Sequence, residues 1–219
     1  MLMPLKRKPR RESGRSLPFA ETAVATRTAP ARGDNGDLPE SRREILIAEA
    51  ARLFGGKGYE NTSMRDIAAA FGILPGSLYH HFSSKEDLFV AVYSSGVSQI
   101  RNTVSEAIAG HTDPWDRLEA ACAAHLQALL VKDSFAAVVI SHLSFNSLPS
   151  RKELVVLRDR YEDLFKELIA ALPLPSCVDR RFFRLGLLGA MNWSIAWYRP
   201  DVQPPATIAR ELLSLLRRD

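Results

Sequence analysis

The side chains best suited to chemistry in this chain of 219 residues are hydrogen-bonding groups gathered in "GILPGSLYHHFSSKEDLF", from Gly72 to Phe89. Serine, tyrosine and histidine all offer donors of moderate reach. They suit contact with a polar partner rather than bond-making, because no Ser-His-Asp order, phosphate-binding loop or carboxylate pair accompanies them. The sequence therefore indicates a binding protein and not an enzyme.

Metal chemistry is not indicated either. Cys122 and Cys177 lie far apart and match no metal-ligand spacing. His125 and His142 could join Cys122, but no carboxylate stands with them at ligand spacing. We expect two ordinary thiols, no metal site and no cofactor.

Helical periodicity begins after Pro39 and supplies the elements that position the donor-rich stretch. A first apolar stripe at i, i+4, i+7 and i+8 predicts a helix ending at "GGKGY"; it consists of Leu46, Ala50, Leu53 and Phe54. Ser63, followed three residues later by Asp66, resembles a capping box at the start of a second, short helix. Gly72 can close that helix in the left-handed conformation.

A third short helix is predicted from Pro75, whose missing N–H costs nothing in a first turn. Its apolar positions are predicted to face the core: Leu74, Leu78 and Phe82. The other sides then carry Ser77, Tyr79, His80 and His81, although Tyr79 could also pack with only its hydroxyl exposed. Ser83 or Ser84 would cap a fourth helix.

Helix, glycine turn and short polar-faced helix together make a helix-turn-helix, whose second helix enters the DNA major groove. Gly76 removes a side chain where backbone amides could approach a phosphate. Lys85, at the start of the next helix, is placed to contact the DNA backbone.

The segment from Arg43 to Tyr93 closely resembles the N-terminal domain of the TetR/AcrR family of bacterial repressors, through Leu-Phe, Gly-Tyr, Thr-Ser, Asp-Ile-Ala, Gly-Ser-Leu-Tyr-His-His-Phe and Ser-Lys-Glu. The resemblance implies a homodimer that reads double-stranded, palindromic operator DNA. Pro75 departs from the polar residue or lysine of many relatives. The DNA-contacting residues that the resemblance implies are Thr62, Ser63, Pro75, Gly76, Ser77, Tyr79, His80, His81 and Lys85.

Residues 1–39 are expected to be a disordered basic arm. The first fifteen residues carry six cations and a single acid, and the arm shows no apolar periodicity. Such an arm could contact DNA or remain a solvated tail. Residues 40–87 are then the helix-turn-helix domain.

Residues 88–219 read as five or six further helices forming an effector-binding and dimerisation domain. One stripe runs through Phe135 and Val139, and another through Leu154, Tyr161 and Leu168. The segment "DRRFFRLGLLGAMNWSIAWYRP" is apolar nearly all round and predicts a helix ending at Pro200 that is buried on two sides. The predicted dimer seam comprises Gly186, Gly189, Ala190, Ile208, Leu212, Leu215 and Leu216.

Polar and aromatic residues on apolar faces could line an effector pocket, although such histidines could equally be satisfied core residues. The candidates are His125, His142, Phe145, Asn192, Trp193 and Trp197. The ending from Asn192 to Pro200 resembles a TetR/AcrR subgroup associated with fatty-acid or steroid catabolism and acyl-CoA effectors.

The sequence therefore predicts an all-α, one-component transcriptional repressor released from its operator by a small hydrophobic effector. The alternative is a DNA-bound protein of the same fold that is regulated by a protein partner and has no pocket. No run of 18 apolar residues is present and the N-terminus has no hydrophobic signal region, so we expect a cytoplasmic protein with no membrane partner.

Overall fold

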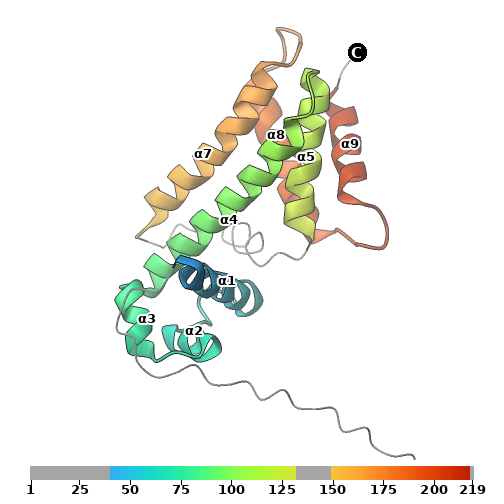
Figure 1. Cartoon of the computed structure of the whole chain (residues 1–219). Coiled ribbons are helices and arrows are strands. Elements are labelled where there is room, and N and C mark those ends of the chain that lie inside the picture. Colours follow the sequence, from blue (N-terminus) through green and yellow to red (C-terminus); the bar gives the residue numbers. More distant parts are fainter. Residues whose placement is uncertain (1–39, 132–148, 218–219) are drawn as a thin grey trace, which may run out of the picture. The chain divides into compact units, whose positions relative to one another are not determined.

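The structure is a computed structural model that describes residues 40–131 and 149–217. Every regular element in these residues is helical (Figure 1), which confirms the predicted all-α class. The elements are α1 Glu40–Lys57, α2 Met64–Phe71, α3 Pro75–His81, α4 Lys85–Ile108, α5 Pro114–Leu130, α7 Arg151–Ala170, α8 Arg180–Trp193, the 3-10 turn η2 Ser194–Ala196, and α9 Pro205–Leu216. The predicted basic arm and the stripe through Phe135 and Val139 lie outside the described residues.

The end of α1 differs slightly from the prediction. The helix continues through the paired glycines to Lys57 and ends at Gly58, which has φ of 83°. Only a residue without a Cβ adopts this left-handed conformation without strain, so Gly58 is the stop. Its N–H donates to the Phe54 carbonyl at 3.0 Å, which closes the last turn.

The second helix has both predicted caps. The Ser63 hydroxyl accepts from the Asp66 N–H at 3.1 Å, and the Asp66 carboxylate accepts from the Ser63 N–H at 2.8 Å. These bonds satisfy two amides that a helix N-terminus otherwise leaves unpaired. Gly72, with φ of 77°, ends α2 as predicted.

The third helix begins at Pro75, but one predicted core residue is wrong. Leu78 and Phe82 are buried, whereas Leu74 is 76% exposed. Leu74 is the N-cap of α3 and has extended backbone angles. Helical spacing therefore does not apply to it, and its side chain does not share the face of Leu78.

An aromatic cluster joins the helix-turn-helix to the long helix α4. The Phe54 and Phe89 rings lie 5.6 Å apart and the Tyr59 and Phe89 rings 4.8 Å apart, both in edge-to-face contact. The cluster links α1, the turn after it and α4, which also packs against α5 and α7 further along. Because α4 runs unbroken through residues 87 and 88, the predicted domain boundary falls inside one helix.

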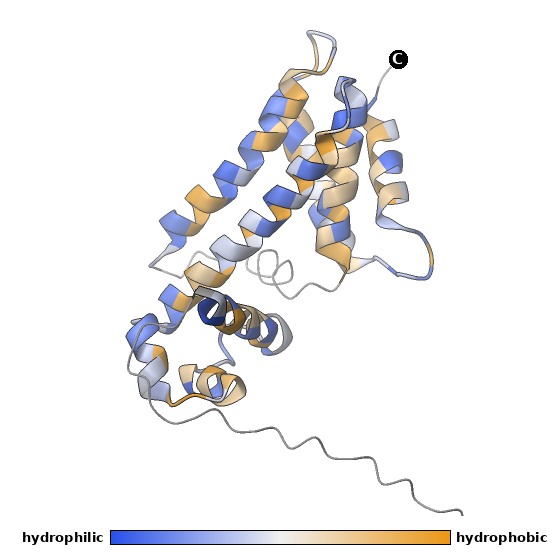
Figure 2. Ribbon diagram, in the orientation of Figure 1, coloured by the Kyte–Doolittle hydropathy of each residue, from blue (hydrophilic) through white to orange (hydrophobic). Residues whose placement is uncertain are grey.

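Helices α4, α5, α7, α8 and α9 share one apolar core, with α5 packed against each of the others. Apolar and polar residues alternate by turn along α7 (Figure 2), and Leu154, Tyr161 and Leu168 are buried as predicted. Helix α8 ends at Trp193 rather than near Pro200. The buried Ser194 hydroxyl donates to the Met191 carbonyl at 2.6 Å, where the chain tightens into η2.

None of the helices described in residues 40–131 and 149–217 combines the length and the apolar character needed to span a bilayer.

Candidate nucleic-acid interface and effector-domain site

Helix α3 presents polar groups because its apolar residues hold it down. Leu78 has no exposed surface, while Ser77, Tyr79 and His80 are exposed, Tyr79 to 52%. A Cβ added at Gly76 would meet no atom within 4 Å, so the backbone at the start of α3 is open to an approaching surface. Pro75 and His81 are half-buried at the two ends of the helix.

Ser63 and Thr62 occupy different environments although they are neighbours in the chain. Ser63 is exposed at the N-cap of α2. Thr62 is 1% exposed, its hydroxyl donates to the Gly58 carbonyl at 2.8 Å, and its N–H donates to the Tyr59 carbonyl at 3.2 Å. Because both Thr62 donors are used internally, its predicted phosphate contact does not fit. Thr62 instead holds the turn between α1 and α2.

Lys85 is fixed by the same turn. Its Nζ donates to the Tyr59 carbonyl at 3.0 Å and lies 4.1 Å from the centre of the Tyr59 ring. A cation over an aromatic face is attracted by the ring quadrupole. An ammonium group has three donors, so two remain for a phosphate once one is bound to Tyr59.

Two cations near this surface were not singled out from the sequence. Arg65 is exposed in the first turn of α2, two residues after the exposed cap Ser63. Arg43 lies with its guanidinium 5.1 Å from the centre of the Phe82 ring, at the end of α3. The position of Arg65 beside the cap could have been read from the sequence, whereas the Arg43 contact depends on how α1 packs.

The effector domain contains a buried polar triad of His125, Tyr161 and Asn192. His125 Nδ1 lies 2.7 Å from the Tyr161 hydroxyl and Nε2 lies 3.2 Å from Asn192 Oδ1. Since Oδ1 can only accept, Nε2 carries the proton and Tyr161 donates to Nδ1. Burial lowers the pKa of His125 to about 4 and raises the pKa of Tyr161. Both groups are therefore neutral near pH 7.

The structure brings together only part of the predicted effector set. His125 and Asn192 are bonded to each other, but Trp193 is 70% exposed and Trp197 is 45% exposed. Trp193 follows Asn192 directly in a helix, so its side chain points about 100° away from the triad. His142 and Phe145 lie outside the described residues.

Helix α8 has an exposed apolar face, here called the α8 face. Within this single chain it contains Phe182, Leu185, Gly186, Gly189 and Trp193. Phe182 is 70% exposed, and a Cβ added at Gly186 or Gly189 would meet nothing within 4 Å. Ala190 is half-buried. The two glycines therefore leave open surface between large apolar side chains.

Helix α9 matches the predicted seam less well. Ile208 is 2% exposed and packs inside its own chain, so its assignment to a dimer surface is corrected. Leu212 and Leu216 are half-buried, and Leu215 is 77% exposed. Periodicity grouped these residues correctly on a helix, but packing against α5 uses the side that carries Ile208.

One side-chain contact links the DNA-reading end of the chain to α7. The Glu86 carboxylate, in the first turn of α4, accepts from the Ser150 N–H at 2.6 Å. Ser150 is the N-cap of α7, so this bond ties the beginnings of α4 and α7 together. Among the described residues no group of three His, Cys, Asp or Glu side chains could hold a metal ion.

Comparison with known proteins places these features in a family. The model for bacterial regulatory proteins of the tetR family matches residues 46–92, and the model for the tetracyclin repressor-like C-terminal domain matches residues 111–219. The chain belongs to the TetR family. It is therefore a DNA-binding transcriptional repressor with an N-terminal helix-turn-helix and a C-terminal helical domain.

Relatives extend the match over most of the chain. The HTH-type transcriptional repressor KstR2 of Mycolicibacterium smegmatis is 36% identical over 181 residues, covering 76% of this chain and 84% of that protein. KstR2 of Rhodococcus jostii is 29% identical over 202 residues, covering 85% and 95%. The crystal structure of AibR in complex with isovaleryl coenzyme A and operator DNA has a TM-score of 0.69 and 26% identity, covering 80% of this chain and 97% of AibR. These relatives are regulators and not enzymes.

Proposed function

We propose that this TetR-family protein is a homodimer that represses transcription from a palindromic operator and is released by a small hydrophobic effector. The observation that carries the DNA-reading part is the recognition helix α3. Leu78 fixes it to the core, and Ser77, Tyr79 and His80 project from it. Donors on a short helix of this kind can reach base edges in the major groove.

Phosphate contacts in this proposal come from the exposed Ser63 and Arg65 and from the spare donors of Lys85. Contacts of this type set the register of the helix on DNA and supply most of the salt-dependent affinity. Lys85 is fixed by Tyr59 before DNA arrives, so little side-chain entropy is lost on binding. The reader is proposed to span residues 40–87.

The α8 face supports the dimer. A soluble protein rarely leaves several large apolar side chains together in water, and glycines between them allow two helices to approach closely. A second copy packed against this face, with Leu215 of α9 beside it, would cover them. Two-fold pairing also places two recognition helices on successive half-sites.

The effector is proposed to be an acyl-CoA or a similar lipid-derived molecule, bound within residues 88–219. AibR was crystallised with isovaleryl coenzyme A and operator DNA, and this chain resembles it over 80% of its length. A shift of α7 would reach the reader through the Glu86–Ser150 bond and through the continuous helix α4. A differential binding energy of a few kcal/mol is enough to change which state dominates.

Selection of bound duplexes from a random DNA pool tests the reader. We expect a palindromic consensus, with His80→Ala losing about 1 to 3 kcal/mol of binding free energy on it, the scale of a lost base contact. His111→Ala is the matched control, because His111 is exposed just beyond α4. Failure to recover any consensus, or equal losses in both variants, contradicts the proposed reader.

Fluorescence anisotropy of the selected duplex then tests the effector. Addition of acyl-CoAs with two to eight acyl carbons should release the DNA, whereas coenzyme A alone should not. A protein that reads the palindrome but is not released by any of them would retain the proposed DNA function. That result would favour the alternative of regulation by a protein partner.

A further inference from the structure

Arg117 is the most unusual charged residue in the described part of the effector domain. It lies in the first turn and a half of α5, is half-buried, and its Nε is buried without a hydrogen-bond partner. The ion pairs of the described residues do not include it. An arginine remains charged at any ordinary pH, so a guanidinium with an unused buried donor is prepared for an anion.

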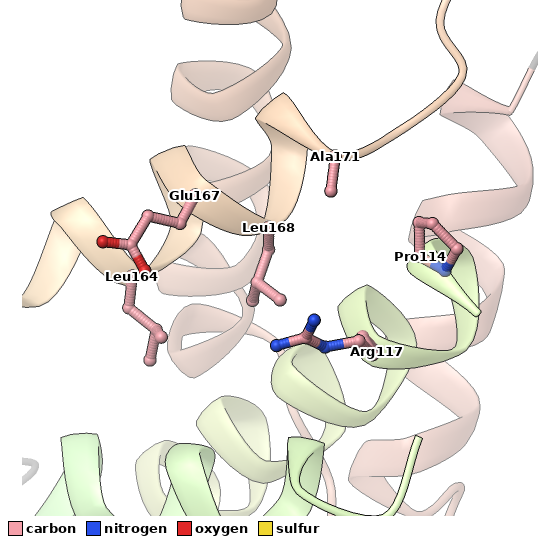
Figure 3. A pocket seen from close by; sticks show the side chains of 6 residues that line it. All are labelled: Pro114, Arg117, Leu164, Glu167, Leu168 and Ala171. Carbon is pink, nitrogen blue, oxygen red and sulfur yellow. The ribbon is translucent and has the colours of Figure 1, made fainter. Parts of the chain in front are cut away.

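The Arg117 side chain reaches into a hollow of about 200 Å³ between α5 and α7. Figure 3 shows it extending from α5 toward Leu168 of α7, while the Glu167 carboxylate points away from it. Apart from Arg117 and Glu167, the lining residues have no charged side chain: Pro114, Leu164, Leu168 and Ala171. The hollow thus combines one cation with an apolar wall.

We infer that the Arg117 hollow binds a small carboxylic acid with a short apolar chain. The planar guanidinium matches a carboxylate with two parallel hydrogen bonds, and Leu164 and Leu168 would cover the chain. A cavity of about 150 Å³ is known to accept benzene, so one of about 200 Å³ suits a ligand of roughly six to eight heavy atoms. Glu167 at the edge disfavours a dianion such as phosphate, since only one cation is present.

This site is separate from the buried triad. Arg117 precedes His125 by two helical turns on α5, and the ring nitrogens of His125 are already bonded to Tyr161 and Asn192. The inference rests on the proposed function only if the acid also alters DNA binding. Binding is therefore measured on the full chain without DNA, so that its failure leaves the repressor proposal intact.

Isothermal titration with hexanoate, against its neutral isostere hexanamide, tests the inference. Hexanoate has eight heavy atoms and should bind saturably, one per chain. Hexanamide should bind at least about tenfold more weakly, because hydrogen bonds from an ionised donor to an ionised acceptor are roughly twice as strong as neutral ones. Absence of saturable hexanoate binding, or equal binding of the two compounds, would overturn the site.

Substitutions then locate the bound acid. Arg117→Met keeps the aliphatic stem but removes the guanidinium, and it should abolish the preference for hexanoate. The control Arg160→Met, at an exposed arginine of α7 outside the hollow, should leave it unchanged. Ala171→Leu should block binding by filling the hollow without changing charge, and it serves if Arg117→Met does not fold. Undiminished hexanoate binding to a folded Arg117→Met or Ala171→Leu would place the acid elsewhere and overturn the inference.

Discussion

Helices α3 and α8 each bury one side and expose the other, but the exposed sides are of opposite character. The outer side of α3 carries Ser77, Tyr79 and His80, whereas the α8 face carries Phe182, Leu185 and Trp193. A polar face is stable in water and gains hydrogen bonds from a polar partner. An apolar face gains by leaving water. The two helices are thus suited to DNA and to a second copy of the chain, respectively.

The largest expected effect comes from giving the α8 face a charge. Leu185→Glu should yield monomers in sedimentation velocity, because a dimer would bury two unpaired carboxylates at a cost of several kcal/mol. Loss of the dimer should also weaken binding to a full palindrome by more than about 100-fold, since each half-site then binds alone.

The matched control is Val156→Glu on α7, because Val156 is 48% exposed and Leu185 is 43% exposed. We expect this variant to remain dimeric. If Leu185→Glu also remains dimeric, the seam lies elsewhere and the contrast between α3 and α8 loses its meaning.

A second prediction concerns the inner side of α8, where Asn192 bonds to His125. The folded-state pKa of His125 is lowered to about 4 from an ordinary value of 6.5. Between these values the unfolded chain takes up a proton that the folded chain does not, so stability falls as pH decreases through this window. The loss attributable to His125 between pH 7 and pH 4.5 should be about 2 to 3 kcal/mol.

Urea unfolding at the two pH values measures this loss. His125→Gln keeps a donor and an acceptor but cannot titrate, so its pH dependence should be smaller than that of the wild type by that amount. Tyr161 and Cys122, whose pKa values burial raises, stay neutral throughout. Identical pH dependence in the two proteins would mean that His125 is not buried in its neutral form.

The third prediction concerns the polar side of α3. Tyr79→Phe removes one hydroxyl from a side chain that is 52% exposed, so folding should be unaffected. Affinity for the selected operator should fall by about 1 to 2 kcal/mol if the hydroxyl bonds a base, with random duplex bound as before. Tyr198→Phe, in the half-buried residue after Trp197, is the control. Equal loss on operator and random DNA would assign Tyr79 to the DNA backbone instead.

The smallest effect is expected at Lys85. Lys85→Ala should lower the slope of log affinity against log salt by roughly 1 per subunit, equally for all sequences, because one counterion fewer is released. Lys166→Ala, at an exposed lysine on α7, should leave the slope unchanged. An unchanged slope in Lys85→Ala would mean that the contact with Tyr59 uses the ammonium fully.

The outcomes for individual residues separate what is local from what is not. The capping box of Ser63 and Asp66, the left-handed Gly72 and the buried Leu78 followed from spacing, since each depends on residues within one or two turns. Leu74 did not, because it precedes the first helical residue and helical spacing stops there. Thr62 did not either, because its hydroxyl meets the carbonyl of Gly58 in a turn whose path depends on packing.

The sequence by itself determined the helices, their caps, the family and the two-sided character of α8. Only the tertiary structure decided which side of each helix is buried in this chain. It placed His125 against Asn192, 67 residues away, turned Ile208 inward and left Phe182 and Trp193 outside. It also brought Arg117 of α5 against Leu168 of α7. The physical reason is that periodicity specifies which residues share a face, whereas the neighbour of that face is chosen by contacts between distant segments.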